Sequence, residues 1–409
     1  MNNQEELIER LTRFYREAGR EISSMPPVWE PGKRRAVGWL RPALASIVLV
    51  ALAIGLAVTI RAVRDEAHRK TAPLPTVSAS PSSSPSPSAS ATPLSSWVTR
   101  RVYFGQVAEL SLDSSAIFAL YAPAPVNGGV DPSKIRLARI DRATGAVTTA
   151  GPFPNATELA RVTAGLWIGA GPERYAPNAG TDWLTLVDPT TLKVKQRIRL
   201  PAQPDLGPFA KPYLAGTSNL LWLAYSESLY RLDPTTGRIL VSKSLSGPAT
   251  SISIDSAGRR LYVAVVPKSG PPALVIELDV SNGSRLGSAP TGGWDLGGPT
   301  VAAAPQGVWI SYATGMMGAV EFRSASDFSM LVGPQFGHTN GIRAFVGGGA
   351  VWFVDGGAGR LACADPSTGR IAASSQETLP GVVVADGNAS YLGDSDGVGF
   401  LQPDPSCPH

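Results

Sequence analysis

The sequence predicts an all-β fold, a seven-bladed β-propeller, preceded by a single transmembrane α-helix and a disordered Pro/Ser-rich linker. Three observations lead to this prediction: two short marks that recur through residues 97–409, an uncharged run at residues 43–60, and a biased segment at residues 71–96. The 43 glycines and 36 prolines among the 409 residues suit many short strands joined by turns.

The first recurring mark is an aromatic residue within a short apolar strand, as in GLWIG or LLWLA. The seven positions are Phe118, Trp167, Trp222, Tyr262, Trp309, Trp352 and Tyr391. We place each aromatic residue on the second strand of a blade, where it fills the gap to the neighbouring blade. Recurrence in every unit indicates core packing rather than a ligand cage.

The second mark is a strand that ends in aspartate and a turn, as in LYRLDPTTG. Its positions are Asp141, Asp188, Asp233, Asp279, Arg323, Asp365 and Asp404. The aspartate accepts hydrogen bonds from backbone N–H groups of the turn, proline presets φ, and glycine supplies the left-handed conformation. The marks repeat about every 39 to 47 residues, a period typical of propeller blades with four strands each.

The two ends of the repeat region predict how the ring closes. The last unit stops at Asp404, after its third strand, whereas the first unit is preceded by an extra strand, WVTRRVYF, at residues 97–104. That strand can complete the last blade and leave no free sheet edge. In an oxidising compartment Cys363 and Cys407 either form a disulfide or are kept apart by the closing strand.

The run ALASIVLVALAIGLAVTI at residues 43–60 contains no charge and spans about 27 Å as a helix, roughly one hydrocarbon core. The long segment that precedes it and the lack of a nearby cleavage site favour a retained anchor over a cleaved signal peptide. We expect a transmembrane helix within residues 41–63. A modest excess of basic residues on the N-terminal side favours a single-pass protein of the cell membrane, with a cytoplasmic N-terminus and the propeller outside.

The segments on either side of the anchor have different characters. Residues 4–22, within a cytoplasmic segment 1–40, show apolar residues at helical spacing. This amphipathic helix either lies on the inner leaflet or docks a cytoplasmic partner. Residues 64–96 form a juxtamembrane stretch and a linker whose serines and prolines cannot bury a core, so the linker holds the propeller away from the membrane.

With these marks, residues 97–409 resemble the YVTN-type and virginiamycin B lyase-like propeller repeats of bacteria and, more loosely, quinoprotein repeats. The resemblance implies the propeller fold. The lyase family uses central acid–base histidines with magnesium, whereas this region contains only His338 and the near-terminal His409. Quinoprotein repeats carry a docking Trp after each turn glycine, which is missing after Gly145.

Composition excludes several classes of function. The formal net charge is +4, and all of the excess lies in residues 1–94, so the propeller is neutral and nucleic acid is not an expected partner. Two cysteines and three histidines are too few and too scattered for a zinc site. We therefore expect no metal, no cofactor and no catalytic residues.

The loops between second and third strands, and between successive blades, are expected on one face. Insertions at 122–135, 171–181 and 266–273 enlarge that face, which is where binding concentrates on a rigid scaffold. Its candidate residues are Arg174, Tyr175, Lys268, Trp294 and His338. The expected function is non-enzymatic binding of an extracytoplasmic protein, glycan or small ligand. The alternative is a lyase or hydrolase of the virginiamycin B lyase-like type that acts at the central channel.

Overall fold

The computed structural model describes most of the propeller region. The described residues are 92–93, 97–123, 131–171, 182–201, 211–268, 270, 272–291, 298–314, 317–337, 342–355, 359–376, 381–386, 389–402 and 406–408. Within these ranges, no helix has the length and hydrophobicity that crossing a membrane requires. The predicted helix 4–22, the predicted anchor 43–60 and nearly all of the linker lie outside them.

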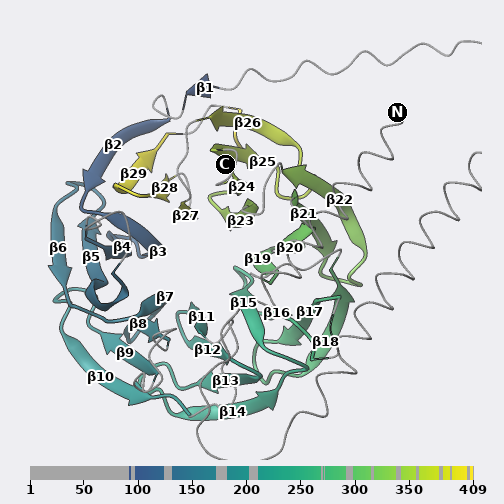
Figure 1. Ribbon diagram of the computed structural model, residues 1–409, viewed down its shortest axis with the longest axis horizontal. Helices are drawn as coiled ribbons and strands as arrows, with labels where there is room; N and C mark the ends of the chain where they lie inside the picture. Colours follow the sequence, from purple (N-terminus) through teal and green to yellow (C-terminus); the bar gives the residue numbers. More distant parts are fainter. Residues whose placement is uncertain are drawn as a thin grey trace, which may run out of the picture. The chain divides into compact units, whose positions relative to one another are not determined.

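The described strands form seven sheets, each with a four-stranded antiparallel core, as the repeat predicted (Figure 1). Blades one to three comprise β3 (Gln106–Leu112), β4 (Ala116–Ala122), β5 (Arg136–Asp141) and β6 (Val147–Ala150); β7 (Ala156–Val162), β8 (Gly165–Ala170), β9 (Trp183–Val187) and β10 (Val194–Arg199); and β11 (Pro212–Thr217), β12 (Leu220–Tyr225), β13 (Ser228–Leu232) and β14 (Ile239–Ser244).

The remaining four blades follow the same plan. Blades four to six comprise β15 (Ala249–Ile254), β16 (Arg260–Val265), β17 (Leu274–Asp279) and β18 (Arg285–Pro290); β19 (Thr300–Ala304), β20 (Gly307–Thr314), β21 (Met317–Ser324) and β22 (Met330–Gly337); and β23 (Ile342–Gly347), β24 (Ala350–Asp355), β25 (Arg360–Ala364) and β26 (Ile371–Gln376). Blade seven comprises β27 (Val382–Asp386), β28 (Ala389–Gly393), β29 (Gly397–Leu401) and β2 (Val98–Tyr103). The seven-bladed prediction is confirmed.

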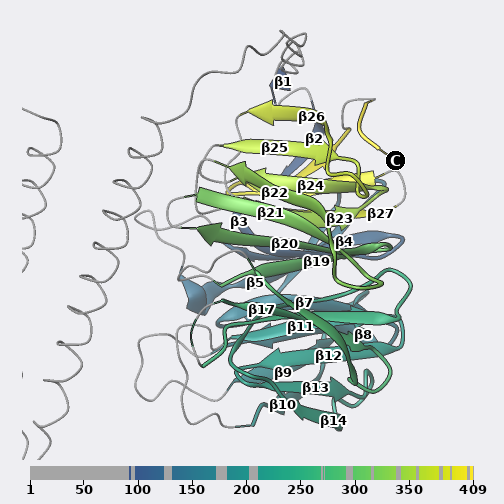
Figure 2. The ribbon, with the colours of Figure 1, turned by 90° about the vertical axis from the view of Figure 1, so that its right-hand side faces the viewer.

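The first strand of each blade lies nearest the axis of the ring and the fourth lies outermost (Figure 1). Figure 2 shows the ring from its side, with strands of successive blades stacked past one another. The loops between second and third strands and the connections between blades share one end of the ring, which we call the loop end. The short hairpins, such as residues 163–164 and 234–237, lie at the other end, the hairpin end.

The ring closes with the strand that the sequence predicted. Strand β2 pairs antiparallel with β29, so the N-terminal strand of the propeller completes the last blade. Trp97, just before β2, packs edge-on against Trp352 with ring centroids 6.4 Å apart. A disulfide joins Cys407 to Cys363 on β25, whose Cα atoms are 5.7 Å apart, so the C-terminal segment is held on blade six.

Two residues of the predicted linker also pair with the propeller. Strand β1 (Thr92–Pro93) runs parallel to the outer strand β26, with Thr92 opposite Ser375. The sequence predicted no pairing here, because serine- and proline-rich composition disfavours a strand. An unpaired outer edge offers backbone hydrogen bonds to any extended segment, which explains how even this composition can pair.

The aspartate turns have the predicted geometry. The Asp233 carboxylate accepts hydrogen bonds from the backbone N–H groups of Thr235 at 2.9 Å and Thr236 at 2.7 Å. The Gly237 N–H donates to the Asp233 carbonyl at 2.8 Å, and Gly237 has a φ of 66°. The hydrogen bonds from the Thr236 and Thr235 turn groups lower the pKa of Asp233, so the carboxylate stays charged.

The two recurring marks contact each other across the blade interfaces. The Trp167 indole donates to the Pro234 carbonyl in the next blade's turn at 2.8 Å, and Trp222 and Trp309 make the same bond to Val280 and Pro366. A Cβ added to Gly237 would lie 2.8 Å from the Trp167 ring. The turn glycine is thus required twice, for its backbone conformation and for the tryptophan packed against it.

Two interfaces replace the Trp–Gly pair by a smaller ring and a larger turn residue. Phe118 of blade one packs in a cluster with Leu192, which holds the glycine position of blade two at a φ of 56°. Tyr262 of blade four packs against Phe328, which holds that position in blade five at a φ of 59°. The volume lost from the second strand is restored from the turn, so the interface stays filled.

Two positions of the turn mark were assigned wrongly. In blade seven the prediction was Asp404, but Gln402 occupies the position: Ser390 pairs with Leu401, and the Gln402 N–H donates to the Trp97 carbonyl as the Asp233 N–H donates to Arg238. The sequence prediction placed Arg323 at the aspartate position of blade five, but Ser324 occupies it: Gly307 pairs with Ser324 as Arg260 pairs with Asp279. The Ser324 hydroxyl accepts from the Ser326 N–H at 3.1 Å, as the aspartates do elsewhere. Serine replaces aspartate as the turn acceptor here, so no acidic residue marks the site in the sequence.

Candidate functional site

A layer of seven first-strand residues surrounds the axis near the loop end. Each member pairs with the residue two positions after the aromatic residue of its own blade, and we call the set the axial layer. Its members are Glu109, Glu158, Tyr213, Ser251, Thr300, Arg343 and Val382. The seven aromatic residues, Phe118, Trp167, Trp222, Tyr262, Trp309, Trp352 and Tyr391, form the corresponding aromatic set on the second strands.

The axial layer differs sharply from the next layer toward the hairpin end. That layer consists of Ser111, Ala160, Ala215, Ser253, Ala302, Phe345 and Val384, which carry no charge. Charged side chains of the axial layer therefore lie over a layer of small and apolar residues. The inner-strand charges nearer the hairpin end, Arg161 and Asp386, form ion pairs with Asp113 and Arg142. Because packing around the axis does not require charge, this distribution marks the loop end as a candidate site.

Bulges precede the two acidic residues. The pairing of β3 with β4 skips a residue between Val107 and Glu109, and that of β7 with β8 skips one between Ala156 and Glu158. The same irregularity recurs in β15 before Ser251. After the bulge these strands have the same register with the second strand as the strands without one, so the axial-layer residue lies on the same face of the sheet in all seven blades.

Glu158 is bound in an ion pair with Lys211, the residue just before β11. The Lys211 Nζ lies 2.7 Å from the Glu158 Oε1, and the two side chains are 37% and 12% exposed. Burial alone would lower the pKa of Lys211, but the Glu158 carboxylate outweighs it and the pKa is raised. The Lys211 ammonium also lies 4.6 Å from the Tyr213 ring centroid, a cation–π contact.

Glu109 has a different protonation state. Burial, followed by the nearby Glu158 carboxylate, raises the pKa of Glu109 to about 8, although Lys211 and Arg343 oppose the shift. Its carboxyl accepts one hydrogen bond, from the Leu110 N–H at 3.2 Å. The raised pKa favours the protonated form of this carboxyl near neutral pH, beside the Glu158–Lys211 ion pair.

Arg343 completes the charged part of the layer from blade six. It is exposed, and among the described residues no hydrogen bond or ion pair engages its guanidinium. Val382 of blade seven separates it from Glu109 around the ring. In the axial layer, the Arg343 guanidinium and the protonated Glu109 carboxyl therefore have hydrogen-bond donors that no described residue engages.

The predicted loop residues fall mostly outside the described ranges. Arg174, Tyr175, Trp294 and His338 are in this group. Lys268 is described: it is exposed at the loop end and lies 2.8 Å from the Glu227 carboxylate of blade three. The loop that follows β8 starts close to the axial layer, because a Cβ added to Gly171 would lie 3.3 Å from the Lys211 Cβ.

The sequence analysis missed the charged members of the axial layer. Glu109, Glu158, Lys211 and Arg343 stand in no recurring motif and are far apart in the chain. One signal was available in the sequence: an ionisable residue in a first strand, where apolar residues are common in the other blades. Groups of three or more potential metal ligands are absent from the described part of the chain.

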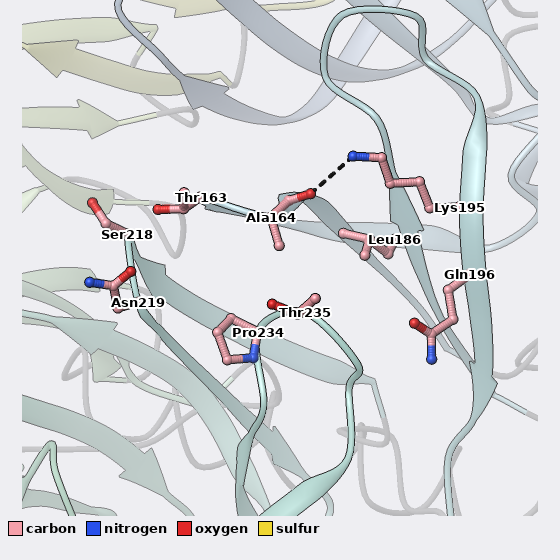
Figure 3. Close-up of a pocket in the computed structure, with 9 residues that line it drawn as sticks. All are labelled: Thr163, Ala164, Leu186, Lys195, Gln196, Ser218, Asn219, Pro234 and Thr235. Carbon is pink, nitrogen blue, oxygen red and sulfur yellow. Dashed lines mark hydrogen bonds between the residues drawn. The ribbon is translucent and has the colours of Figure 1, made fainter.

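A hollow lies at the hairpin end, between blades two and three, with a volume of about 460 Å³ (Figure 3). Ala164, Ser218 and Pro234 line it from three hairpins. Lys195 donates to the Ala164 carbonyl at 3.2 Å and pairs with Asp188 at 2.9 Å, while Gln196 donates to the Thr236 carbonyl at 2.7 Å. Its polar side chains thus bind the hairpins to one another, so it is a weaker candidate than the axial layer.

Comparison with known proteins supports the fold alone. No protein-family model and no curated protein matches the chain. Hydrazine synthase of Kuenenia stuttgartiensis is similar over 75% of this chain and 97% of its own, with a TM-score of 0.54 and 11% identity. A chain of the mitotic checkpoint complex matches 82% of this chain and 99% of its own, with a TM-score of 0.54 and 12% identity. The Cps50 (Swd1) propeller of Myceliophteria thermophila matches 75% and 99%, with a TM-score of 0.52 and 11% identity. At such identities, proteins with unrelated roles share this architecture, and the similarity identifies a β-propeller.

Proposed function

We propose that this protein is a non-enzymatic binding module whose ligand is held by the axial layer at the loop end of the ring. The observation that carries the proposal is the placement of Glu109, Glu158, Lys211 and Arg343 at one end of the inner strands. Partly buried charges cost free energy unless they are paired. A ring that needs none of them for packing retains them for recognition.

The proposed setting is the outer face of a cell membrane. The uncharged residues 43–60 supply the anchor, and the linker separates the propeller from the bilayer. The disulfide between Cys363 and Cys407 supports this setting, because such bonds persist in oxidising compartments. Protease treatment of intact cells should release the propeller while leaving an N-terminal tag on residues 1–40 protected; the reverse pattern would refute the orientation.

The proposed family is the YVTN-type propeller repeat. Its support is the aspartate turn joined to an aromatic second strand, which recurs from blade to blade. The family assignment adds no residue to the site, since the histidines of the lyase relatives have no counterpart in the axial layer.

The binding proposal is tested by comparing the two ends of the ring. The purified full-length chain is applied to arrays of defined glycans, peptides and small organic acids. We expect the variant Glu158→Gln/Lys211→Gln/Arg343→Gln to lose at least about tenfold in affinity for its ligand, as expected when charged contacts are removed. The control variant Lys195→Gln/Arg370→Gln changes charges at the hairpin end and should bind normally. Equal binding by wild type and the axial variant would refute the proposal.

An enzymatic role is the second candidate, and one observation favours it. Glu109, with its raised pKa, lies beside the Glu158–Lys211 ion pair, an arrangement that suits general acid–base chemistry in a hydrolase or lyase. Products formed from any ligand found on the arrays would be sought by mass spectrometry. Turnover that disappears in Glu109→Gln while binding persists would establish catalysis; unchanged ligand after prolonged incubation would exclude it for that ligand.

A further inference from the structure

The hollow at the hairpin end has a frame that blades two and three build together. The Thr163 N–H donates to the Ser218 carbonyl at 2.8 Å, which joins the first hairpins of the two blades. The Trp167 indole donates to the Pro234 carbonyl at 2.8 Å and fixes the aspartate turn of blade three beside them. Three hairpins are thus held in place before any ligand arrives, so binding at this position needs little further ordering.

Four side chains of the hollow carry hydrogen-bonding groups that the protein does not use. Thr163, Ser218 and Thr235 each bring a hydroxyl, Asn219 brings a carboxamide, and all four residues are exposed. Figure 3 shows these side chains around one space. Within the described ranges, no residue forms a hydrogen bond with any of the four side chains. Their donors and acceptors are therefore available to a ligand.

The Thr235 hydroxyl differs from its counterpart in blade six. Ser367, at the same place in that turn, donates its hydroxyl proton to the Asp365 carboxylate at 2.6 Å. Thr235 instead donates to the Asp233 carboxylate through its backbone N–H, at 2.9 Å, and no described residue engages its hydroxyl. The turn of blade three thus leaves to the hollow a hydroxyl that the turn of blade six uses for itself.

The rest of the lining is apolar or already paired. Leu186, Ala164 and Pro234 contribute apolar surface. Lys195, the single charged residue of the lining, pairs with the Asp188 carboxylate at 2.9 Å. The hollow therefore offers neutral donors and acceptors beside apolar surface. Its volume of about 460 Å³ lies within the range of small-molecule sites.

We propose that this hollow is a second binding site, beyond the axial layer, and that it takes a neutral saccharide through Thr163, Ser218, Asn219 and Thr235. A sugar hydroxyl both donates and accepts hydrogen bonds, as the protein hydroxyls and the carboxamide do, so the two sets pair without net charge. The C–H groups of a sugar ring match the apolar part of the lining. An anion would meet an ammonium that Asp188 already neutralises, and a purely apolar ligand would leave the hydroxyls without partners.

The test titrates the full-length chain with four neutral sugars and one anionic sugar. The neutral probes are glucose, galactose, mannose and N-acetylglucosamine, and the anionic probe is glucuronate. Saturation-transfer NMR should show saturable binding of at least one neutral sugar and none of glucuronate. The affinity should change by less than about twofold between about 0.05 and 0.5 M sodium chloride, because no free charge contributes to binding.

Two variants locate the contacts. Thr163→Val/Thr235→Val keeps the side-chain size and removes two hydroxyls, so it should weaken binding of the neutral sugar at least about tenfold. Thr190→Val is the matched control, because Thr190 stands at the same place in the turn of blade two but does not line the hollow. It should bind the sugar as wild type does, and urea unfolding checks that both variants are folded.

Three results would overturn the proposal. The first is saturable binding of glucuronate in place of the neutral sugars. The second is neutral-sugar binding that Thr163→Val/Thr235→Val leaves intact. The third is the absence of saturable binding for all the neutral sugars.

The axial layer is tested separately. The variant Glu158→Gln/Lys211→Gln/Arg343→Gln should bind the neutral sugar normally, and Thr163→Val/Thr235→Val should keep the ligand of the axial layer. A sugar that only the axial variant loses would belong to the axial layer, and the proposal for the hollow would be wrong. A sugar that binds equally to wild type and the axial variant counts against the axial layer only if the hairpin variant binds it too.

Discussion

The first and second strands of the blades follow opposite rules. On the second strands, the same kind of residue recurs in all seven blades, fully or nearly buried, and three of the tryptophans bind the next blade's turn in the same way. On the first strands, the axial layer runs through glutamate, tyrosine, serine, threonine, arginine and valine. Repetition therefore marks what every interface needs, and departure from it marks the layer that we propose as a binding site.

The two irregular interfaces make the comparison more precise. At Phe118–Leu192 and Tyr262–Phe328 the residues change, but the volume is conserved between ring and turn. In the axial layer, charge changes from blade to blade with no compensation in the layer below. Differences between blades that conserve the packed volume can thus be told apart from differences that introduce charged side chains.

The largest effect is expected from the aromatic set. Trp222 is completely buried, and its indole donates to the Val280 carbonyl at 3.0 Å. Trp222→Ala should lower the free energy of unfolding by about 3–5 kcal/mol, through the cavity and the lost hydrogen bond. Arg343→Gln, in the exposed part of the axial layer, should change it by less than about 0.5 kcal/mol. Urea unfolding of both variants checks the contrast, and comparable losses would show that the axial layer is structural as well.

A smaller effect tests the exchange of volume between ring and turn. Gly237→Leu should destabilise by about 2–3 kcal/mol, because its Cβ alone would meet Ile198 at 2.6 Å and Trp167 at 2.8 Å. Adding Trp167→Phe should recover about 1 kcal/mol or more, since the pair then copies Phe118 and Leu192. The double-mutant cycle is measured by denaturant unfolding. The reciprocal cycle at the first interface, Phe118→Trp with Leu192→Gly, is the control; additive effects in both cycles would contradict size complementarity.

The sequence was sufficient for the fold because the marks are local. An aspartate, its turn and the aromatic residue of the same blade lie close together in the chain, and the count and the closing strand β2 follow from them. The two errors, Arg323 for Ser324 and Asp404 for Gln402, arose where a residue other than aspartate occupies the turn position. Ser324 keeps the hydrogen bond of the aspartates that it replaces.

The site could not be predicted in the same way. A bulge before Glu109 shifts the pairing of β3 by one residue, and no glycine or proline in QVAELSL announces that bulge. The approach of Glu158 to Lys211 depends on how two inner strands lie beside each other, with an insertion between them in sequence. Charge was visible in the sequence, but its orientation was not.

The smallest expected effect is a pH dependence of stability, which the axial layer should produce and the aromatic set should not. In the unfolded chain the carboxyl of Glu109 titrates near its usual pKa of 4.5, but in the folded ring its pKa is about 8. The folded state holds this proton more tightly, so the favourable contribution is complete below pH 4.5 and is lost as the pH rises toward 8. Between pH 6.5 and pH 8, the wild-type chain should lose about 1–2 kcal/mol of stability relative to Glu109→Gln, which cannot ionise.

Urea unfolding of both chains across this range measures the difference. Trp222→Phe serves as the control, because a change in the aromatic set adds no titrating group and should shift the whole curve in parallel with wild type. If the wild-type and Glu109→Gln curves are themselves parallel, folding does not raise the pKa of Glu109. The observation that favours an enzymatic role would then be lost, and the axial layer would remain a candidate for binding alone.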